Sequence, residues 1–459
     1  MSIFGAGIDT RQRGDKGLSL GLMKLLFLAW QDPELRKRLI FVLSMFGVFA
    51  LGVHIQVPIP GVDPADLYDK LSKDNMFFAL LNSMGGGAIR HLSILSLGLN
   101  PYITSSIVLQ IYTQASPALK AEMKEGGEYA RRRNNARTRL VTLALCLVQS
   151  WGLLTLISRF EPSVADIWVK IPVVFFWTAG AMFQLWLGEQ ITERGIGNGI
   201  SMMIFAGIVI ALPQQFSSIW HSAFIDQVIP WWKVFLLFAA FVATTWLVVL
   251  FTTAQRRIPI QTARRQVGNR AVAGQVNYLP LSVNTAGVIP IIFAVSLLFI
   301  PNQFAGYAAP DSPFSLFWQG VAKWLNPVGE GWAWLVGSGA YVLMIFGFSY
   351  FYTAIQYNVE DIADNLKRSN AFIPGVRPGA KTRTFLDGVI SRVTIIGAFF
   401  LAVVALAQYW VPVWLGIDVV TRGNGVRIIG GTTLLIVVTV ALETMRQIEA
   451  NILMKQYGS

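Results

Sequence analysis

Residues Met84–Tyr112 read MGGGAIRHLSILSLGLNPYITSSIVLQIY, and this stretch is the most informative part of the chain. From Ile94 to Thr113 it carries no charge, and about 20 predominantly apolar residues are enough to span a bilayer. Asn100 and Pro101 nevertheless lie inside the segment, and proline removes a backbone donor and disfavours helix at the preceding residue. Because lipid cannot satisfy free backbone groups, the segment is expected to face protein or water.

The composition is that of a polytopic membrane protein. Of the 459 residues, 54% are hydrophobic and only 14% are charged, whereas soluble domains carry about 25% charged residues. The net charge of +12 does not imply nucleic acid, because the basic residues lie in the connections between apolar segments. The single cysteine, Cys146, excludes an intrachain disulfide, and the three histidines have no metal-ligand spacing.

Ten segments are long and apolar enough to cross a bilayer, so the predicted fold is all-α and polytopic. The predicted spans are Leu39–Val57, Ile94–Thr113, Leu140–Ile157, Ile171–Gly188, Gly199–Phe216, Val234–Thr253, Val283–Ile300, Val336–Ile355, Val389–Trp410 and Ile428–Met445. Gln184 and Pro172 interrupt the fourth of them. Ahead of the first span, Leu18–Trp30 predicts an interfacial amphipathic helix rather than a signal peptide, because Lys24 interrupts its apolar run.

The distribution of basic residues predicts the orientation. Most of the 37 Lys and Arg residues fall in segments that share one side if the N-terminus is inside, so both termini are expected to be cytoplasmic. The ten spans divide into five in residues 1–230 and five in residues 231–459, and an odd number per half makes any repeat between the halves inverted. Leu95–Leu109 and Leu281–Val295 each combine an Asn, a Gly and a Pro, which is weak support for such a repeat.

Two inner loops, residues 252–282 and 356–387, are longer than a minimal connection between spans. Basic loops on the inner side ordinarily follow the positive-inside rule and need no other explanation. The alternative is a docking platform for a soluble partner, which the turn-rich run FIPGVRPGAKT (Phe372–Thr382) favours.

Motifs for enzyme chemistry are missing from the sequence. It contains no GxxxxGK[ST] loop, HExxH or GxSxG, so we predict neither an enzyme nor a bound cofactor or metal. A secondary transporter of a small solute remains an alternative, because such proteins are also built from inverted repeats. It requires a polar or charged site near the midplane, and no convincing buried ionisable residue is present there.

Longer motifs resemble SecY, the channel-forming subunit of the bacterial Sec protein translocon. In sequence order the matching motifs are VPIPGVD (Val57–Asp63), GLNPYITSSIVLQ (Gly98–Gln110), LWLGEQITERGIGNGIS (Leu185–Ser201), QVNYLPLSVNTAGVIPIIFA (Gln275–Ala294), DNLKRSNAFIPGVRPG (Asp364–Gly379) and GGTTLLIVV (Gly430–Val438). The resemblance covers roughly the whole chain. It implies a bacterial cytoplasmic membrane protein with a central hourglass pore between two inverted five-helix halves.

The resemblance also implies a plug and a pore ring. The plug is a short helix near residues 76–93, for which the glycines supply a hinge; the residues carried over to it are Gly85, Gly86, Gly87 and Arg90. The ring is an aliphatic constriction, and it falls on Leu99, Ile103, Ile204, Ile292, Ser296 and Ile436. From helical spacing alone, ordinary packing or lipid contact would be the preferred interpretation of these residues.

A lateral gate is the third implied feature, between spans two and three on one side and seven and eight on the other. Its polar residues are Gln110, Gln149 and Asn284, for which helix–helix hydrogen bonding is an equal alternative. The implied partners are SecE-like and SecG-like membrane subunits, the SecA motor ATPase, the ribosome, precursor polypeptides with signal sequences, and lipid. Arg256, Arg257 and Arg377 are the residues carried over as contacts to the motor or the ribosome.

Overall fold

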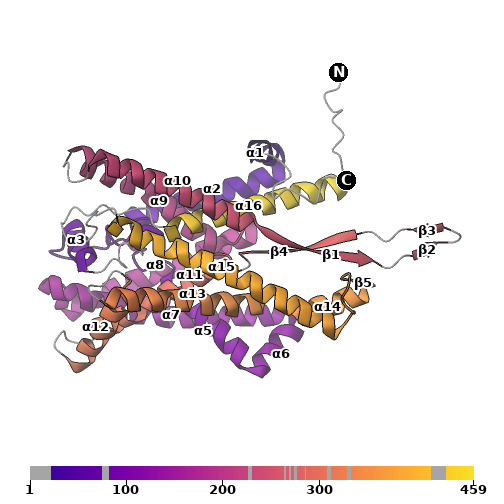
Figure 1. Cartoon of the computed structure of the whole chain (residues 1–459). Helices are drawn as coiled ribbons and strands as arrows, with labels where there is room; N and C mark the ends of the chain where they lie inside the picture. The colour runs from indigo at the N-terminus through magenta and orange to yellow at the C-terminus, as the bar shows by residue number, and fades with distance from the viewer. Residues whose placement is uncertain are drawn as a thin grey trace, which may run out of the picture.

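Long helices run side by side and form the main body of the molecule (Figure 1). The computed structural model describes residues 22–74, 82–225, 230–262, 265–267, 270–272, 276–284, 286–307, 312–327, 332–414 and 431–458. The helices up to Trp220 are α1 (Leu22–Gln31), α2 (Pro33–His54), α3 (Pro64–Asp74), α5 (Asn100–Ala115), α6 (Pro117–Glu125), α7 (Gly127–Phe160), α8 (Ile167–Arg194) and α9 (Gly199–Trp220). The later helices are α10 (Trp231–Thr253), α11 (Ile289–Gly306), α12 (Pro313–Leu325), α13 (Ala333–Gln356), α14 (Val359–Arg368), α15 (Ala380–Trp414) and α16 (Gly431–Gly458).

Eight helices among the described residues are long and apolar enough to cross a membrane. They coincide with eight of the ten predicted spans, and the remaining two predicted spans correspond to α5 and α16. The helix α5 has only 16 residues, and the first residues of the predicted tenth span, 428–430, lie outside the described residues. The all-α polytopic membrane fold that the sequence predicts is therefore the observed one.

The second and seventh predicted spans begin later than expected. The helix α5 starts at Asn100 rather than Ile94, and α11 starts at Ile289 rather than Val283. Each has a proline in its first turn, where the missing N–H has no intrahelical partner to lose, so the proline starts the helix instead of interrupting it. The residues just before each helix have a non-helical backbone, which shortens both helices in the same way.

Both of these non-helical segments pass very close to a helix of the same half. A Cβ atom added to Gly180 of α8 would overlap the carbonyl oxygen of Ile94, and one added to Gly397 of α15 would overlap that of Val283. In the predicted order of spans, α8 is the fourth and α15 the ninth. The same backbone-on-glycine contact therefore occurs at corresponding places in the two halves.

A small β-sheet lies outside the bundle, which the sequence analysis did not predict. β1 (Gln255–Thr262) pairs antiparallel with β4 (Val276–Ser282), and β5 (Ala371–Phe372) pairs with the far end of β1. The short strands β2 (Arg265–Val267) and β3 (Arg270–Val272) form a second ribbon, and the whole arm projects beyond the helices (Figure 1). The residues predicted as two separate loops thus join in one sheet.

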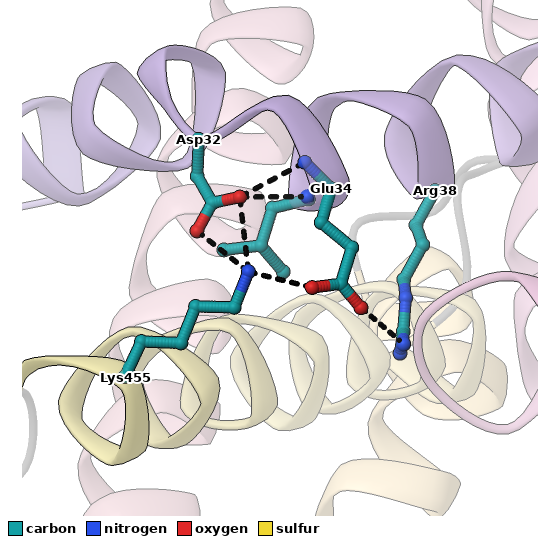
Figure 2. A network of polar contacts seen from close by, with 5 residues as sticks. Asp32, Glu34, Arg38 and Lys455 are labelled. Atoms are coloured by element: carbon teal, nitrogen blue, oxygen red, sulfur yellow. Dashed lines mark hydrogen bonds and ion pairs between the residues drawn. The ribbon is translucent and has the colours of Figure 1, made fainter. Parts of the chain in front are cut away.

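The first and last described helices meet at the end of the bundle from which this arm projects (Figure 1). Helix α1, which matches the later part of the predicted amphipathic helix, packs against α2 and α16. Lys455 of α16 forms ion pairs with Asp32 and Glu34, and Glu34 also pairs with Arg38 (Figure 2). Beneath these charges lies a small buried apolar cluster, which consists of Ala29, Leu35, Ile196, Met445, Ile448 and Ile452.

The segment predicted as a plug helix differs from that expectation in its described part. Residues 82–84 are helical, but residues 85–99 form turns apart from an isolated bridge between Ser93 and Gln56. The remaining residues of the predicted plug, 76–81, lie outside the described residues. We call residues 82–93 the plug segment below.

Candidate functional site

A central cavity of the bundle is lined by all six residues that were predicted to form a ring. They are Leu99, Ile103, Ile204, Ile292, Ser296 and Ile436. Four elements far apart in the sequence supply them: α5 with the residue before it, α9, α11 and α16. Met84 and Gly85 of the plug segment line the same cavity.

The ring side chains nearly fill this cavity. Leu99, Ile103, Ile204 and Ile436 are each at most 6% exposed and belong to the largest buried apolar cluster, against which Ile292 packs. About 40 Å³ remains for the centres of water molecules, which is room for only a few waters. Aliphatic side chains offer ions no compensation for lost hydration, so a constriction of this kind disfavours their passage.

Ser296 is the polar member of the predicted ring. Its hydroxyl donates a hydrogen bond to the carbonyl oxygen of Ile292, one turn earlier in α11, at 2.8 Å. This bond satisfies the hydroxyl proton within the helix, so Ser296 does not need a water in the cavity as its acceptor. The polarity of this position is thereby reduced.

The cavity also has polar lining residues that the sequence analysis did not assign to a site: Gln184, Ser96, Asn100 and Thr432. Gln184 of α8 is 2% exposed, and its Oε1 has no hydrogen-bond partner among the described residues. The interruption of an apolar span by a glutamine was the available signal, but sequence alone does not show which face of the helix points inward.

Hydrogen bonds to Asn82 hold the plug segment together. Asn82 accepts hydrogen bonds from the amide of Gly87 through its carbonyl oxygen (2.8 Å) and from the amide of Arg90 through Oδ1 (2.9 Å). Gly85, Gly86 and Gly87 are buried, whereas Arg90 is half-buried. The three glycines and Arg90 therefore lie in one compact turn structure.

Only one of the three predicted gate residues lies at the seam between α7 and α11. Helix α11 packs against both α5 and α7, and Gln149 of α7 lines a second cavity there together with Asn302 and Gln303 of α11. Gln110 and Asn284 do not line it. The Oε1 of Gln110 and both polar side-chain atoms of Asn284 are buried without a hydrogen-bond partner among the described residues.

Asn302 and Gln303 were missed because they follow the end of the predicted seventh span at Ile300. The helix continues to Gly306, and its last turn faces α7. There Gly152 of α7 contacts Gly306 and Tyr307: a Cβ added to Gly306 would lie 3.2 Å from the carbonyl oxygen of Gly152. The two helices thus touch at backbone distance at this end of the seam.

The predicted partner contacts lie on the β arm and the turn beside it. Arg256 in β1 and Arg377 in the turn between β5 and α15 are exposed, while Arg257 is half-buried. Because Gln261 of β1 pairs with Phe372 of β5, the two segments that carry these arginines are parts of one sheet-linked unit. The residues described hold no group of three or more His, Cys, Asp or Glu side chains suited to a metal ion.

Ten predicted spans and a narrow, mostly aliphatic cavity lined by four distant elements, with Met84 and Gly85 of the plug segment in its lining, are typical of one class: a polytopic membrane channel. The SecY family model matches residues 93–445. The chain is 40% identical over 435 residues to the protein translocase subunit SecY of Halalkalibacterium halodurans, covering 92% of this chain and 96% of that protein. It is 39% identical over 446 residues to SecY of Aquifex aeolicus, covering 95% and 98%. The chain belongs to the SecY family.

Solved structures agree with this assignment at the level of the fold. A structure described as that of a protein conducting channel superimposes with a TM-score of 0.62 at 16% identity, covering 91% of this chain and 93% of that one. A second, concerned with the plug domain of SecY, gives a TM-score of 0.63 at 16% identity with the same coverage. As a SecY homologue with many apolar helices, the chain is a protein of the bacterial cytoplasmic membrane.

Proposed function

We propose that this chain forms a protein-conducting channel for the secretion of unfolded polypeptides across the membrane and for the lateral insertion of membrane proteins. One observation carries the proposal: residues from four distant elements converge on one mostly aliphatic cavity, and Met84 and Gly85 of the plug segment line it too. Aliphatic side chains make no directional bonds, so such a ring can deform around an extended polypeptide and close again behind it. We assign the ring to the six predicted residues, all of which are among those that line the cavity.

The architecture that we propose has two inverted halves, residues 1–230 and 231–459. Its support is the matching late start of α5 and α11 and the matching glycine contacts of Gly180 and Gly397. Inverted halves allow a passage to open by movement of one half against the other around a fixed centre. With the basic residues on the inner side, both termini face the cytoplasm.

The lateral exit lies at the seam where α11 meets α5 and α7. Gln149, Asn302 and Gln303 are polar groups at this seam, Gln110 lies in α5, and Asn284 lies in the connection between β4 and α11. Hydrogen bonds between helices inside a membrane contribute on average only about 0.6 kcal/mol. Contacts of that strength can hold a gate shut and still yield to an arriving apolar signal segment.

The channel is passive and takes its energy from partners. A solved structure with a similar fold is described as Sec61 in the canine ribosome–channel complex. We propose that the ribosome and a SecA-type motor dock on the β arm and the turn beside it through Arg256, Arg257 and Arg377. SecE-like and SecG-like subunits complete the complex in the membrane. The chain itself has no catalytic role and binds no cofactor.

The deciding experiment is transport into vesicles that contain this chain, its small membrane partners and the motor. A precursor with a signal sequence should become protected from added protease when ATP is present, and it should remain accessible without ATP or without the motor. If an intact complex gives no motor-dependent protection, the proposal is wrong.

A secondary solute transporter is the alternative from a different class, and Gln184 is the observation that favours it. A buried amide with a free acceptor in a central cavity is the kind of group that binds a small polar solute. Saturable uptake of a small solute in the absence of the motor would support that function instead. Vesicles with the chain but without the motor therefore serve both as the control for transport and as the test of the alternative.

A further inference from the structure

The plug segment packs against the backbone of α9. A Cβ atom added to Gly207 of α9 would overlap the carbonyl oxygen of Met84 and would lie 3.0 Å from the Met84 carbonyl carbon and 3.2 Å from the Gly86 nitrogen. These are backbone atoms, which cannot move aside as the end of a side chain can. Only glycine at position 207 therefore allows the plug segment to approach this helix so closely.

The plug segment also has a glycine, Gly86, at its contact with Gly207. Gly86 has a φ of +72°, a conformation that residues with side chains rarely adopt. A Cβ on Gly86 would lie 3.4 Å from the Gly207 Cα and 3.5 Å from Val53 Cγ2 of α2. Gly86 thus sits between α9 and α2, and glycine meets glycine at the point of closest approach.

A second contact lies further along the same helix. Gln215 donates a hydrogen bond from Nε2 to the hydroxyl oxygen of Ser83 at 3.0 Å. Residues 207 and 215 are eight apart, which places them on similar faces of α9 about two turns from each other. The helix therefore holds the plug segment at two points, one by shape and one by a hydrogen bond.

These contacts differ in strength and in ease of release. A single neutral hydrogen bond adds little net stability, because separated groups bond to water instead. The glycine contact depends on close packing alone, so it is lost as soon as the segment moves away and regained when it returns. This combination suits a part that must leave its place during each transport event.

We infer that Gly207 is a positioning residue that seats the plug segment in the closed channel, with Gln215 as its polar support. The inference rests on the proposed function, because a seat has a role only if the chain is a channel. The inference assigns to α9 the part of the channel wall that fixes where the plug segment lies in the closed channel. The residues of the plug segment alone do not reveal that part of the wall. Gly207 touches no transported chain at rest; it acts through Met84 and Gly86.

The test is Gly207→Ala in the complex reconstituted in planar bilayers. The overlap should shift the plug segment outward and raise the resting ion conductance roughly tenfold, the size expected for overpacking of a tight contact. Gly347→Ala in α13 is the matched control, because a Cβ there meets nothing within 4 Å. Conductance equal to that of the unmodified complex and of Gly347→Ala would overturn the inference.

A cross-link separates displacement of the plug from general damage to the helix. Cysteines at Ser83 and Gln215 can be bridged by a short bifunctional reagent, since the only native cysteine, Cys146, is buried. If displacement of the plug segment causes the leak, bridging the two cysteines should restore low resting conductance in Gly207→Ala. A leak that persists after bridging contradicts the positioning role of Gly207.

If Gly207→Ala does not fold, the same cysteine pair in the unmodified background decides the matter. Its cross-linking yield should be high at rest and low when a precursor is stalled in the channel, and an unchanged yield overturns the inference. Precursor transport by the unmodified complex is measured in parallel. If the unmodified complex transports no precursor, the proposed function is wrong. If it transports precursor normally and Gly207→Ala has the same resting conductance as the unmodified complex, only the positioning role of Gly207 is wrong.

Discussion

Lys455 Nζ lies 3.0 Å from Asp32 Oδ2, so the last helix of the chain is bound to the beginning of its first spanning helix (Figure 2). Asp32 is also the N-cap of α2: its Oδ1 accepts hydrogen bonds from the amides of Glu34 (2.9 Å) and Leu35 (3.4 Å). The hydrogen bond from Lys455 is the main cause of the lowered pKa of Asp32. One carboxylate therefore caps α2 and joins the start of that helix to α16.

The two roles of Asp32 can be separated by substitution. Asp32→Asn keeps a good cap but removes the ion pair, whereas Asp32→Ala removes both. We expect Asp32→Ala to be less stable than Asp32→Asn by about 1 kcal/mol, the usual contribution of a cap. Thermal unfolding in detergent measures the difference, and added salt should reduce the stability of the unmodified protein more than that of either variant. Equal stabilities of the two variants would contradict the capping role.

The pore ring yields a prediction about resting leakage. Replacing both Ile103 and Ile292 by serine puts two hydroxyl groups into the constriction and removes apolar volume, so water and ions should enter it more readily. The resting conductance in planar bilayers is expected to rise while motor-dependent transport persists. Ile111→Ser is the control, because Ile111 of the same helix is 44% exposed on the outside of the protein. If the double variant leaks no more than Ile111→Ser, these residues do not form the seal.

The spans were predictable from sequence because apolar length is a local property. The starts of α5 and α11 were not, because the sequence does not show that Pro101 and Pro290 lie in the first turns of their helices. The contacts that fix the preceding segments involve Gly180 and Gly397, which are distant in sequence. Only the three-dimensional structure reveals a fit between a glycine and a remote backbone.

The candidate site also has residues that the sequence could identify and residues that it could not. The ring residues came from a resemblance to a family, since their spacing alone fits any packed helix, and the cavity brings all six together. Gln184 was not identified because a lone amide in an apolar helix does not reveal its neighbours, and Asn302 and Gln303 were not because they lie beyond the predicted end of the seventh span. In β1, Ile258 and Ile260 are buried and alternate with more exposed residues, yet the surrounding arginines made the segment resemble an ordinary basic loop.

The seam between α7 and α11 provides a prediction for the lateral gate. A Cβ on Gly152 would overlap the ring of Tyr307, so Gly152→Ala should push the two helices apart. We expect transport of a precursor with a weakened signal sequence to increase by roughly tenfold, because the closed gate is destabilised. Adding Tyr307→Ala should make room for the methyl group and reverse the effect. Gly320→Ala, which has nothing within 4 Å, is the control; an increase that Tyr307→Ala fails to reverse would exclude this mechanism.

Arg377 provides a prediction for the motor. Its exposed guanidinium can bind a carboxylate through two parallel hydrogen bonds, and Arg377→Glu replaces that attraction by repulsion. Motor-dependent transport should fall by about tenfold, the loss expected for a charged hydrogen bond. Resting conductance should not change, because Arg377 does not line the central cavity. Lys381→Glu, also exposed and four residues later, is the charge-matched control, and an equal loss in both variants would indicate a nonspecific effect of charge.

His91, in the plug segment, provides a prediction about the pH dependence of stability. It lies outside the spanning helices, and its ring is 5.5 Å from that of His54 between centroids. Burial is the main cause of its lowered pKa, and the charges of His54 and Arg90 add to it. Because the folded protein takes up this proton less readily than the unfolded chain, in which the pKa of histidine is near 6.5, stability should decrease as the pH falls below that value.

The unfolding temperature in detergent should therefore drop between pH 7.5 and about 5.5, and His91→Gln should reduce the drop. Because His54→Gln removes only one neighbouring charge, it should reduce the drop less; an identical pH dependence in all three proteins would show that His91 is not the responsible group.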